Sequence, residues 1–554
     1  MKLGEFERAF KLENWPQVVS LGLKLAKKKP CPPQVLSGLG IAYHQSGRWR
    51  EAVKWLTRAV RQDSDYAAEL YRFLGEAEQK LGHHAAAFVA LTQALRLAKR
   101  TGRVGDAFAA NVLAMKGKSA LRLGKVRRAA TCFYRAHEKA VNLYDRCQMY
   151  SSYLLSLNSL PIAEEELFAA HLGYEKIFEA VDPLPPRKRS PGEKIRVGFL
   201  SPDFHRHIAF FFYYQLLAGY DRRQFEFYGY SLDNRFDNFT DLCQKCFTLW
   251  RDVSGLSIED AARRIYDDEI DILIDLAGHC AKNGLPIMAY RPAPAQISAL
   301  GYMATTGLSA VRYIASDKFI DPPERETYCL SEEPLRFRSL FCYTGLSNLP
   351  AAQGAPCERT GRIVLGCFNQ YHKITDGMLV IWREIMRLLP DSRLLLKNMS
   401  FKDEKIIGYA KRRLARLDFP ADRVILEPGS QDYMERYFDV DIALDTFPYT
   451  GGGTTCEALY MGVPVVSLYG DRRGSRFGLS ILSGVGLGEL AVNSADDYVK
   501  RILSLASDRN FLTTLHKNLR PMMLNSSLMD TGHYVREWEE KLKMIYERSK
   551  RDKI

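Results

Sequence analysis

Small and large apolar residues recur at fixed offsets in the first 150 residues. Three segments align without gaps: SGRWREAVKWLTRAV, LGHHAAAFVALTQAL and LGKVRRAATCFYRAH. Counted from Gly47, Gly82 or Gly124, an alanine stands at +5 and +12, and a leucine or phenylalanine at +9. Small residues around a large one suit two closely packed helices, and glycine suits the turn between them. The pattern predicts helical hairpins whose contact positions are Ala52, Ala87, Ala129, Leu56, Leu91, Phe133, Ala59, Ala94 and Ala136.

The segments resemble the tetratricopeptide repeat. Their spacings of 35 and 42 residues predict an insertion around Arg100–Asp106, and an earlier degenerate copy is expected from Asn14, with Val19, Leu23 and Ala26 at the equivalent offsets. Such units stack into a solenoid whose concave face binds extended peptide, because a single unit cannot bury its apolar face. Alternatively, the repeats serve only to brace the next domain.

After Lys194 the pattern changes to short apolar runs separated by longer amphipathic stretches. One set is IRVGFLS, FEFYGYS and DILIDLAG; the other is RIVLGCFN, RLLLKN, RVILEP, DIALDT and PVVSLY. Near-continuous apolar runs between helices are typical of parallel strands buried on both faces. We therefore predict repeats over residues 1–150, a helical connector and proline-rich linker over 151–192, and two doubly wound α/β domains over 193–350 and 351–554, the second with a terminal helix.

The composition is that of an ordinary globular protein. The 554 residues are 46% hydrophobic and 26% charged, which excludes a collagen, a long coiled coil or a mostly disordered chain. The uncharged stretch from His207 to Tyr220 is too short and too polar to span a bilayer. The first residues carry acids where a signal peptide would be apolar, and the eleven cysteines form no regular framework. We expect a reduced, cytoplasmic protein without a membrane span.

Positive charge is concentrated in the repeats. Residues 1–150 hold 27 Lys and Arg against 12 Asp and Glu, whereas the remainder holds 51 against 53, so the formal charge of +13 comes from the first part. A basic module predicts attraction to an acidic partner, whether protein, nucleic acid or anionic lipid. Solvated helix faces are the alternative.

Four loops follow predicted strands, where open parallel sheets bind their ligands. They are Ser201–His207, Gly278–Asn283, Phe368–Lys373 and Phe447–Thr455. In the last loop three glycines let the backbone approach a ligand, and two threonines open a helix whose free N–H groups favour an anion. This loop is a candidate diphosphate site. It is neither a P-loop nor a G-x-G-x-x-G fingerprint, which argues against an ATPase or a dehydrogenase.

Several motifs together resemble glycosyltransferase family 41, the protein O-GlcNAc transferases and SPINDLY proteins. They are SPDFHRH, GH with RPAPAQISALGY, FNQYHKI and LDTFPYTGGGTTCEALYMGVPVVSL. The resemblance runs from about Lys194 to the end. It implies two Rossmann-like halves facing across a cleft (GT-B type), a nucleotide-sugar donor held mainly by the second half, and inverting transfer to Ser or Thr hydroxyls of acceptor proteins. It implies neither a metal nor another cofactor.

The resemblance also implies roles for individual residues. Lys373 would contact the donor diphosphate and stabilise charge on the leaving nucleotide. The other expected donor-binding residues are Gln370, Gly453, Thr454 and Thr455 for phosphate, Glu457 for ribose and Tyr433 for the base. His207 lies near the reacting centre in the family, Asp203 could orient it or share its proton, and His279 could position acceptor or sugar.

Some alternatives stay open on the sequence. Ser475-Arg476 within Gly470–Leu479 favours UDP-GlcNAc as donor, whereas FPYTGGGTTCEALYMGVP is closer to SPINDLY-type proteins, which use GDP-fucose. A non-catalytic repeat scaffold that senses nucleotide sugar is a second class, and a sugar-nucleotide epimerase a third. Asp439-Val440-Asp441 spells a metal-binding D-x-D, but we interpret it as the start of a strand. Acceptor segments along the repeats are the expected partners, nucleic acid is not, and association into homo-oligomers stays open.

Overall fold

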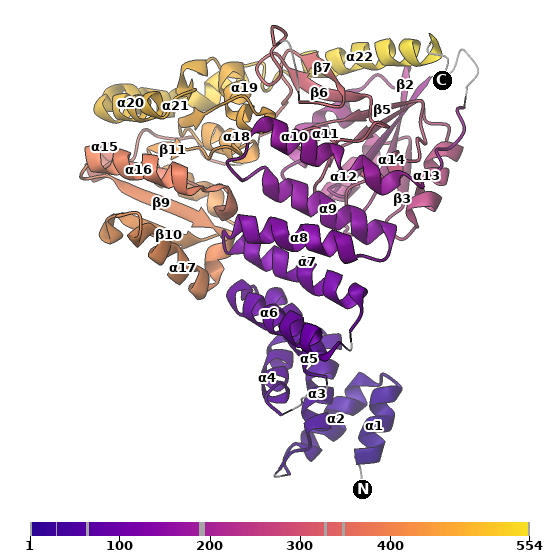
Figure 1. The fold of residues 1–554 in the computed structure, drawn as a ribbon. Coiled ribbons are helices and arrows are strands. Elements are labelled where there is room, and N and C mark those ends of the chain that lie inside the picture. Colours follow the sequence, from indigo (N-terminus) through magenta and orange to yellow (C-terminus); the bar gives the residue numbers. More distant parts are fainter. Residues whose placement is uncertain are drawn as a thin grey trace. The chain divides into compact units, whose positions relative to one another are not determined.

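The computed structural model describes residues 3–28, 30–62, 66–102, 104–187, 194–325, 329–345 and 349–551. The chain forms two compact units (Figure 1). Unit 1 comprises Met1–Met149 and Met399–Arg413, and unit 2 comprises Tyr150–Asn398 and Leu414–Ile554. Each of the eleven cysteines is a free thiol. Among the described residues, no helix combines the length and apolar character that a membrane span requires.

Unit 1 is built from helical hairpins, as the repeat pattern predicts. Its helices are α1 (Leu3–Lys11), α2 (Trp15–Leu25), α3 (Pro33–Gln45), α4 (Trp49–Ala59), α5 (Ala67–Lys80), α6 (His84–Thr101), α7 (Asp106–Arg122) and α8 (Val126–Lys139), with most of α17 (Glu404–Ala415). Gly47, Gly82 and Gly124 occupy the turns at φ of 70°, 80° and 71°. All nine contact positions predicted from these glycines are buried.

Each of the three aligned hairpins packs its large +9 residue onto a glycine of the preceding helix. A Cβ added at Gly40 would lie 2.7 Å from Leu56, one at Gly75 would lie 2.6 Å from Leu91, and one at Gly117 would lie 2.8 Å from Phe133. These glycines stand seven residues before the turn glycines, so they are a further repeated position that the sequence analysis missed.

The first copy of the repeat is offset by one residue from our prediction. Glu13, not Asn14, takes the left-handed turn position at φ 53°, because the Asn14 side chain caps α2 by accepting the N–H of Gln17. The positions counted from Glu13 are Val18, Gly22 and Leu25, and all three are buried. The assignment of Val19, Leu23 and Ala26 was therefore wrong, and Leu23 is 40% exposed.

The predicted insertion lies where α6 ends and α7 begins. Helix α6 has 18 residues against 11 in α4, and Gly102 ends it in the left-handed conformation at φ 63°. Part of the insertion is therefore additional helix rather than loop.

Unit 2 contains two parallel sheets. The first has the order β3-β2-β1-β4-β5-β6-β7 and the second β10-β9-β8-β11-β12-β13. The strands are β1 (Ile195–Ser201), β2 (Phe225–Ser231), β3 (Leu249–Asp252), β4 (Ile272–Asp275), β5 (Ala295–Ser298), β6 (Tyr313–Asp317), β7 (Glu333–Phe337), β8 (Val364–Cys367), β9 (Arg393–Asn398), β10 (Val424–Pro428), β11 (Ile442–Leu444), β12 (Val465–Leu468) and β13 (Ala491–Val492). Strand order reverses between β1 and β4 in one sheet and between β8 and β11 in the other, which confirms two doubly wound halves.

Helices connect the strands of both halves. They are α11 (Phe210–Gly219), α12 (Asn238–Cys246), α13 (Ile258–Asp267), α14 (Leu285–Met288), α15 (Cys357–Thr360), α16 (Asp376–Leu388), α18 (Gly453–Tyr460), α19 (Phe477–Gly484), α20 (Ala495–Ser507), α21 (Arg509–Leu524) and α22 (Thr531–Arg551), and α9 (Leu143–Leu157) and α10 (Glu164–Leu172) precede β1. The terminal helix α22 returns to the first half, where the ring of Trp538 lies 4.6 Å from that of Phe337. Of the proline-rich linker, Pro191 lies outside the described residues.

A buried charge pair joins the two halves. The guanidinium of Arg473, in the loop after β12, donates to the carboxylate of Asp321 and to the carbonyl of Ala315. Close by, the Ser480 hydroxyl donates to Asp317 Oδ2 over 2.5 Å. Removal of one partner from a buried pair costs about 3–5 kcal/mol, so these contacts restrain the halves.

The offset in the first repeat can be tested by two substitutions. Glu13→Gly should raise the free energy of opening the α1–α2 hairpin by up to about 1 kcal/mol, because a side chain in the left-handed region costs about 1–2 kcal/mol and the added freedom of glycine in the unfolded chain offsets part of this gain. Asn14→Ala should lower it by about 1 kcal/mol through loss of the cap. Hydrogen exchange of α1 and α2 amides measures both. Equal destabilisation by the two substitutions would contradict the offset.

Candidate active site

The four predicted loops flank the two positions where strand order reverses. The loops Ser201–His207 and Gly278–Asn283 follow β1 and β4, and the loops Phe368–Lys373 and Phe447–Thr455 follow β8 and β11. In doubly wound sheets this is where ligands bind. A small hollow at the second position is lined by residues that include Asn369, Asp445 and Thr454.

The glycine-rich loop leads directly into α18. The first hydrogen bond of this helix runs from the Cys456 N–H to the carbonyl of Gly452, so the N–H groups of Gly453, Thr454 and Thr455 belong to the first turn. Such groups have no partner within the helix and favour an anion. At Gly451 a Cβ would lie 2.5 Å from Thr454 Oγ1, which explains why the loop requires a glycine there.

Lys373 lies against the same loop. Its ammonium donates to the Thr450 carbonyl over 3.2 Å and lies 3.4 Å from the centre of the Tyr449 ring. The side chain is buried, and burial lowers the pKa of Lys373 to about 8 although Asp445 opposes the shift. The structure thus brings the predicted cation and the predicted helix terminus together.

Asp445, which the sequence analysis did not single out, organises this loop. Its Oδ1 accepts the N–H groups of Gly451 (2.7 Å) and Thr446 (2.8 Å), and its Oδ2 accepts the Ser467 hydroxyl over 2.7 Å. The Asn369 amide also donates to Oδ1, over 3.2 Å. Burial raises the pKa of Asp445. An acid at the carboxyl end of β11, directly before the glycine loop, was the signal that could have revealed it.

The loop after β8 contacts α18 through Asn369. The Thr454 hydroxyl donates to Asn369 Oδ1 over 3.0 Å, and the Thr455 hydroxyl donates to the carbonyl of Gly451 over 3.1 Å. Gln370 is exposed, and its backbone carbonyl accepts the Lys373 N–H. The two threonines therefore lie at the helix terminus as predicted, each with a protein partner in this structure.

The first half reaches the same helix terminus through Ile208. A Cβ added at Gly453 would lie 2.2 Å from Ile208 Cγ1, so the loop after β1 packs directly on the start of α18. In that loop His207 is exposed, and its Nδ1 lies 3.5 Å from Asp203 Oδ2. Partial burial lowers the pKa of His207, and Asp203 opposes this shift.

His279 occupies a different environment from the one we expected. It is almost fully buried, and its Nε2 donates to the Thr306 carbonyl over 2.7 Å. Burial lowers the pKa of His279 well below its usual value, so the ring is neutral and its Nδ1 accepts the Ser151 hydroxyl over 2.9 Å. With both nitrogens bonded inside the protein, this geometry argues against contact between His279 and a substrate.

Glu457 and Tyr433 form a pair beside α18. The Tyr433 hydroxyl donates to Glu457 Oε1, and burial raises the pKa of Glu457 to about 7. The expected ribose-binding and base-binding side chains therefore lie side by side.

The D-x-D segment begins a strand, as expected. Asp441 is buried and accepts the N–H groups of Cys357 and Val364, both over 2.8 Å.

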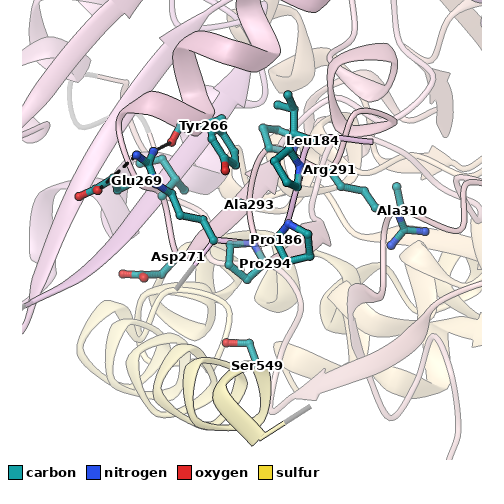
Figure 2. Close-up of a pocket in the computed structure, with 14 residues that line it drawn as sticks. Leu184, Pro186, Tyr266, Glu269, Asp271, Arg291, Ala293, Pro294, Ala310 and Ser549 are labelled. Atoms are coloured by element: carbon teal, nitrogen blue, oxygen red, sulfur yellow. Dashed lines mark hydrogen bonds and ion pairs between the residues drawn. The ribbon is translucent and has the colours of Figure 1, made fainter. Parts of the chain in front are cut away.

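A separate cavity of about 110 Å³ lies at the amino ends of strands of the first sheet (Figure 2). Asp271, Pro294 and Ala310, which precede β4, β5 and β6, line it together with Leu184 and Pro186 of the linker. It belongs to the amino ends of the strands, away from the four loops.

Comparison with known proteins adds independent information. The model of Glycosyl transferase family 41 matches residues 174–339 and 358–538. A tomato (Solanum lycopersicum) protein named "Probable UDP-N-acetylglucosamine--peptide N-acetylglucosaminyltransferase SPINDLY" is 33% identical over 70% of this chain and 42% of its own length. An Arabidopsis thaliana protein of the same name is 36% identical over 66% and 41%. The chain thus spans about two fifths of the length of these relatives.

A solved structure of a Thermobaculum terrenum O-GlcNAc transferase superposes with a TM-score of 0.81 and 27% sequence identity. The match covers 93% of this chain and 98% of that one. With the two facing parallel-sheet halves described above, it supports the GT-B type of architecture. Since the family model matches more than half of the residues, the chain belongs to glycosyltransferase family 41.

Proposed function

We propose that this chain is a protein O-glycosyltransferase that moves N-acetylglucosamine from UDP-N-acetylglucosamine to Ser or Thr hydroxyls of acceptor proteins. The observation that carries the proposal is the contact between Lys373 Nζ and the carbonyl of Thr450, 3.2 Å apart. It joins a cation to the loop that opens α18, and the two together suit one diphosphate. The printed names of the relatives and of the Thermobaculum enzyme support this donor and a protein acceptor.

In the proposed reaction the acceptor hydroxyl oxygen attacks the anomeric carbon, and the bond from that carbon to the β-phosphate oxygen breaks. Negative charge grows on the departing UDP, where Lys373 and the first N–H groups of α18 stabilise it. The pair of His207 and Asp203 would take up the proton that the acceptor hydroxyl loses. Since its pKa is lowered, His207 is neutral at pH 7 and can take up a proton. Family resemblance implies inversion without a metal.

The remaining contacts follow from position. The phosphates would be bound by Thr454 and Thr455, which lie in the first turn of α18, and by Gln370, which lies in the loop after β8. Glu457 would accept ribose hydroxyls and Tyr433 would lie against the base. His279 would act only by holding its loop in place. The helical repeats would hold the acceptor segment, which brings nucleophile and donor together.

The role of Lys373 is tested by Lys373→Ala. We expect turnover to fall about a hundredfold or more, the usual effect of removing a group that stabilises transition-state charge. The chain should remain folded, because removal of a buried charge offsets the loss of the hydrogen bond to Thr450. Lys500→Ala, at a lysine whose side chain is 75% exposed, is the control and should transfer sugar normally. Transfer by Lys373→Ala within a few-fold of the parent chain would refute the role, and no transfer by the parent chain would favour the sensor scaffold.

The lowered pKa of Lys373 predicts a pH dependence of nucleotide binding. A diphosphate binds the protonated ammonium, so affinity should be nearly constant below the pKa of about 8 and decline above it. UDP should bind about tenfold more weakly at pH 9 than at pH 7 in titration calorimetry. Lys373→Arg keeps its charge over this range and should show no such decline. A flat profile for the parent chain would show that the ammonium does not meet the diphosphate.

The donor nucleotide is tested by thermal unfolding with UDP or GDP at equal concentration. A ligand stabilises the folded state by about 2.7 kcal/mol at a hundred times its dissociation constant. We expect UDP to raise the unfolding temperature and GDP to leave it nearly unchanged. The opposite result would identify a SPINDLY-type O-fucosyltransferase that uses GDP-fucose.

A further inference from the structure

Unit 1 carries a concentration of cations that the proposed reaction does not use. Residues 101–149 hold ten Lys and Arg but three Asp and Glu, and residues 399–413 hold five against two. Both segments belong to unit 1, so their charges add within one compact body. The question is whether these cations are paired inside the protein or available to a partner.

Three of the cations alternate with two aromatic rings. Lys116 of α7 lies 5.2 Å from the ring centre of Phe88, and Lys125, just before α8, lies 5.1 Å from the same ring. Lys125 also lies 4.7 Å from the ring centre of Tyr409. Arg412 lies at the same distance from that ring, and Tyr409 and Arg412 are both on α17. The five side chains form a continuous series, Lys116–Phe88–Lys125–Tyr409–Arg412, which we term the cation–ring row. Helices α6, α7 and α17 and the turn before α8 thus contribute to one feature.

No carboxylate neutralises this row within the described part of unit 1. Ion pairs there join other residues, such as Lys139 with Asp106 and Arg72 with Glu76. The side chains of Lys116, Lys125 and Arg412 form neither a hydrogen bond nor an ion pair with any residue in the described ranges. Burial lowers the pKa of Lys125, and its like-charged neighbours Arg128 and Arg412 lower it further. An anion placed beside the row would relieve this repulsion.

The row is accessible to a macromolecule. Arg412 is exposed, Tyr409 as a residue is 37% exposed, and Lys116 and Lys125 are half-buried. Rings hold the stems of the cations in place, so less side-chain freedom is lost when an anion binds. The row therefore offers three oriented positive charges to one extended ligand.

The arrangement of the rings favours a peptide over a nucleic acid. Single-stranded nucleic acids bind largely by stacking bases on open aromatic faces. Here both rings already carry two cations each. Carboxylates of an acidic peptide need only the cations, and these remain able to donate hydrogen bonds outward.

We propose that the cation–ring row is a docking site for an acidic stretch of the acceptor protein, separate from the Ser or Thr that receives the sugar. The identification of the ligand as an acceptor rests on the proposed function; the binding of an acidic peptide does not. Such a site would select substrates by a sequence feature remote from the modified residue and would raise local acceptor concentration.

Direct binding is the first test. The probe is a fluorescein-labelled peptide of ten glutamates, followed by anisotropy with the full chain at low salt. The variant K116Q/K125Q/R412Q should bind at least about tenfold more weakly than the parent. A matched control, K24Q/K27Q/K28Q, removes three exposed lysines of the same unit and should bind within twofold of the parent. Equal weakening by both variants would show only general charge attraction and would overturn the proposal.

Two further measurements separate the alternatives. A labelled dT10 oligonucleotide should bind more weakly than the peptide. Tighter binding that the row variant abolishes would indicate a nucleic-acid site and overturn the proposal.

If the triple variant fails to fold, the single variant K125Q, which leaves both rings in place, replaces it. Its peptide affinity should fall by less than the tenfold expected of the triple variant. Unchanged peptide affinity in a folded K125Q protein would also overturn it.

Transfer kinetics connect the site to catalysis. For an acceptor peptide with a ten-glutamate extension, the row variant should raise KM about tenfold with kcat unchanged, whereas a neutral acceptor should be transferred as by the parent chain. A changed kcat for the neutral acceptor would contradict a docking role. If the parent chain transfers no sugar at all, the proposed function fails, while the binding measurements still decide whether the row captures acidic peptide.

Discussion

The structure of the candidate site depends on a buried ammonium held beside a buried carboxylate. Lys373 contacts the Thr450 carbonyl and the Tyr449 ring, while Asp445 fixes the backbone of the same loop through Gly451 and Thr446. The carboxylate bonds mainly to backbone N–H groups and hydroxyls. The ammonium therefore keeps most of its capacity for a ligand while Asp445 sets the shape of the loop. This division of roles would preorganise the proposed anion site.

The two halves also meet at this loop. Ile208 packs against Gly453, and the pair of Arg473 and Asp321 joins the halves through the loop after β12. Arg473 and Asp321 are both buried, and burial lowers the pKa of Arg473 to about 10. A side chain at position 453 would displace Ile208. The glycine thus serves the packing of the halves.

Much of this architecture could be predicted from the sequence. Periodic alanines and glycines located three hairpins, and the apolar runs located the strands whose carboxyl ends carry the four loops. What could not be predicted depends on contacts between distant residues or on backbone conformation. Glu13 adopts a left-handed conformation that its residue type does not reveal, because asparagine is far commoner at such a position. His279 finds its partners in Ser151 and Thr306, so its neutral, buried state was not visible in a GH motif. The role of Asp445 depends on backbone N–H groups and a distant serine, so its position at the end of a strand did not distinguish it from other polar residues.

The central claim is that Lys373 and the first turn of α18 converge on one diphosphate. A crystal structure of the chain with UDP tests it most directly. The account predicts β-phosphate oxygens within hydrogen-bond distance of Lys373 Nζ and of the N–H groups of Thr454 and Thr455. A diphosphate bound elsewhere, with the lysine still donating only to Thr450, would contradict it.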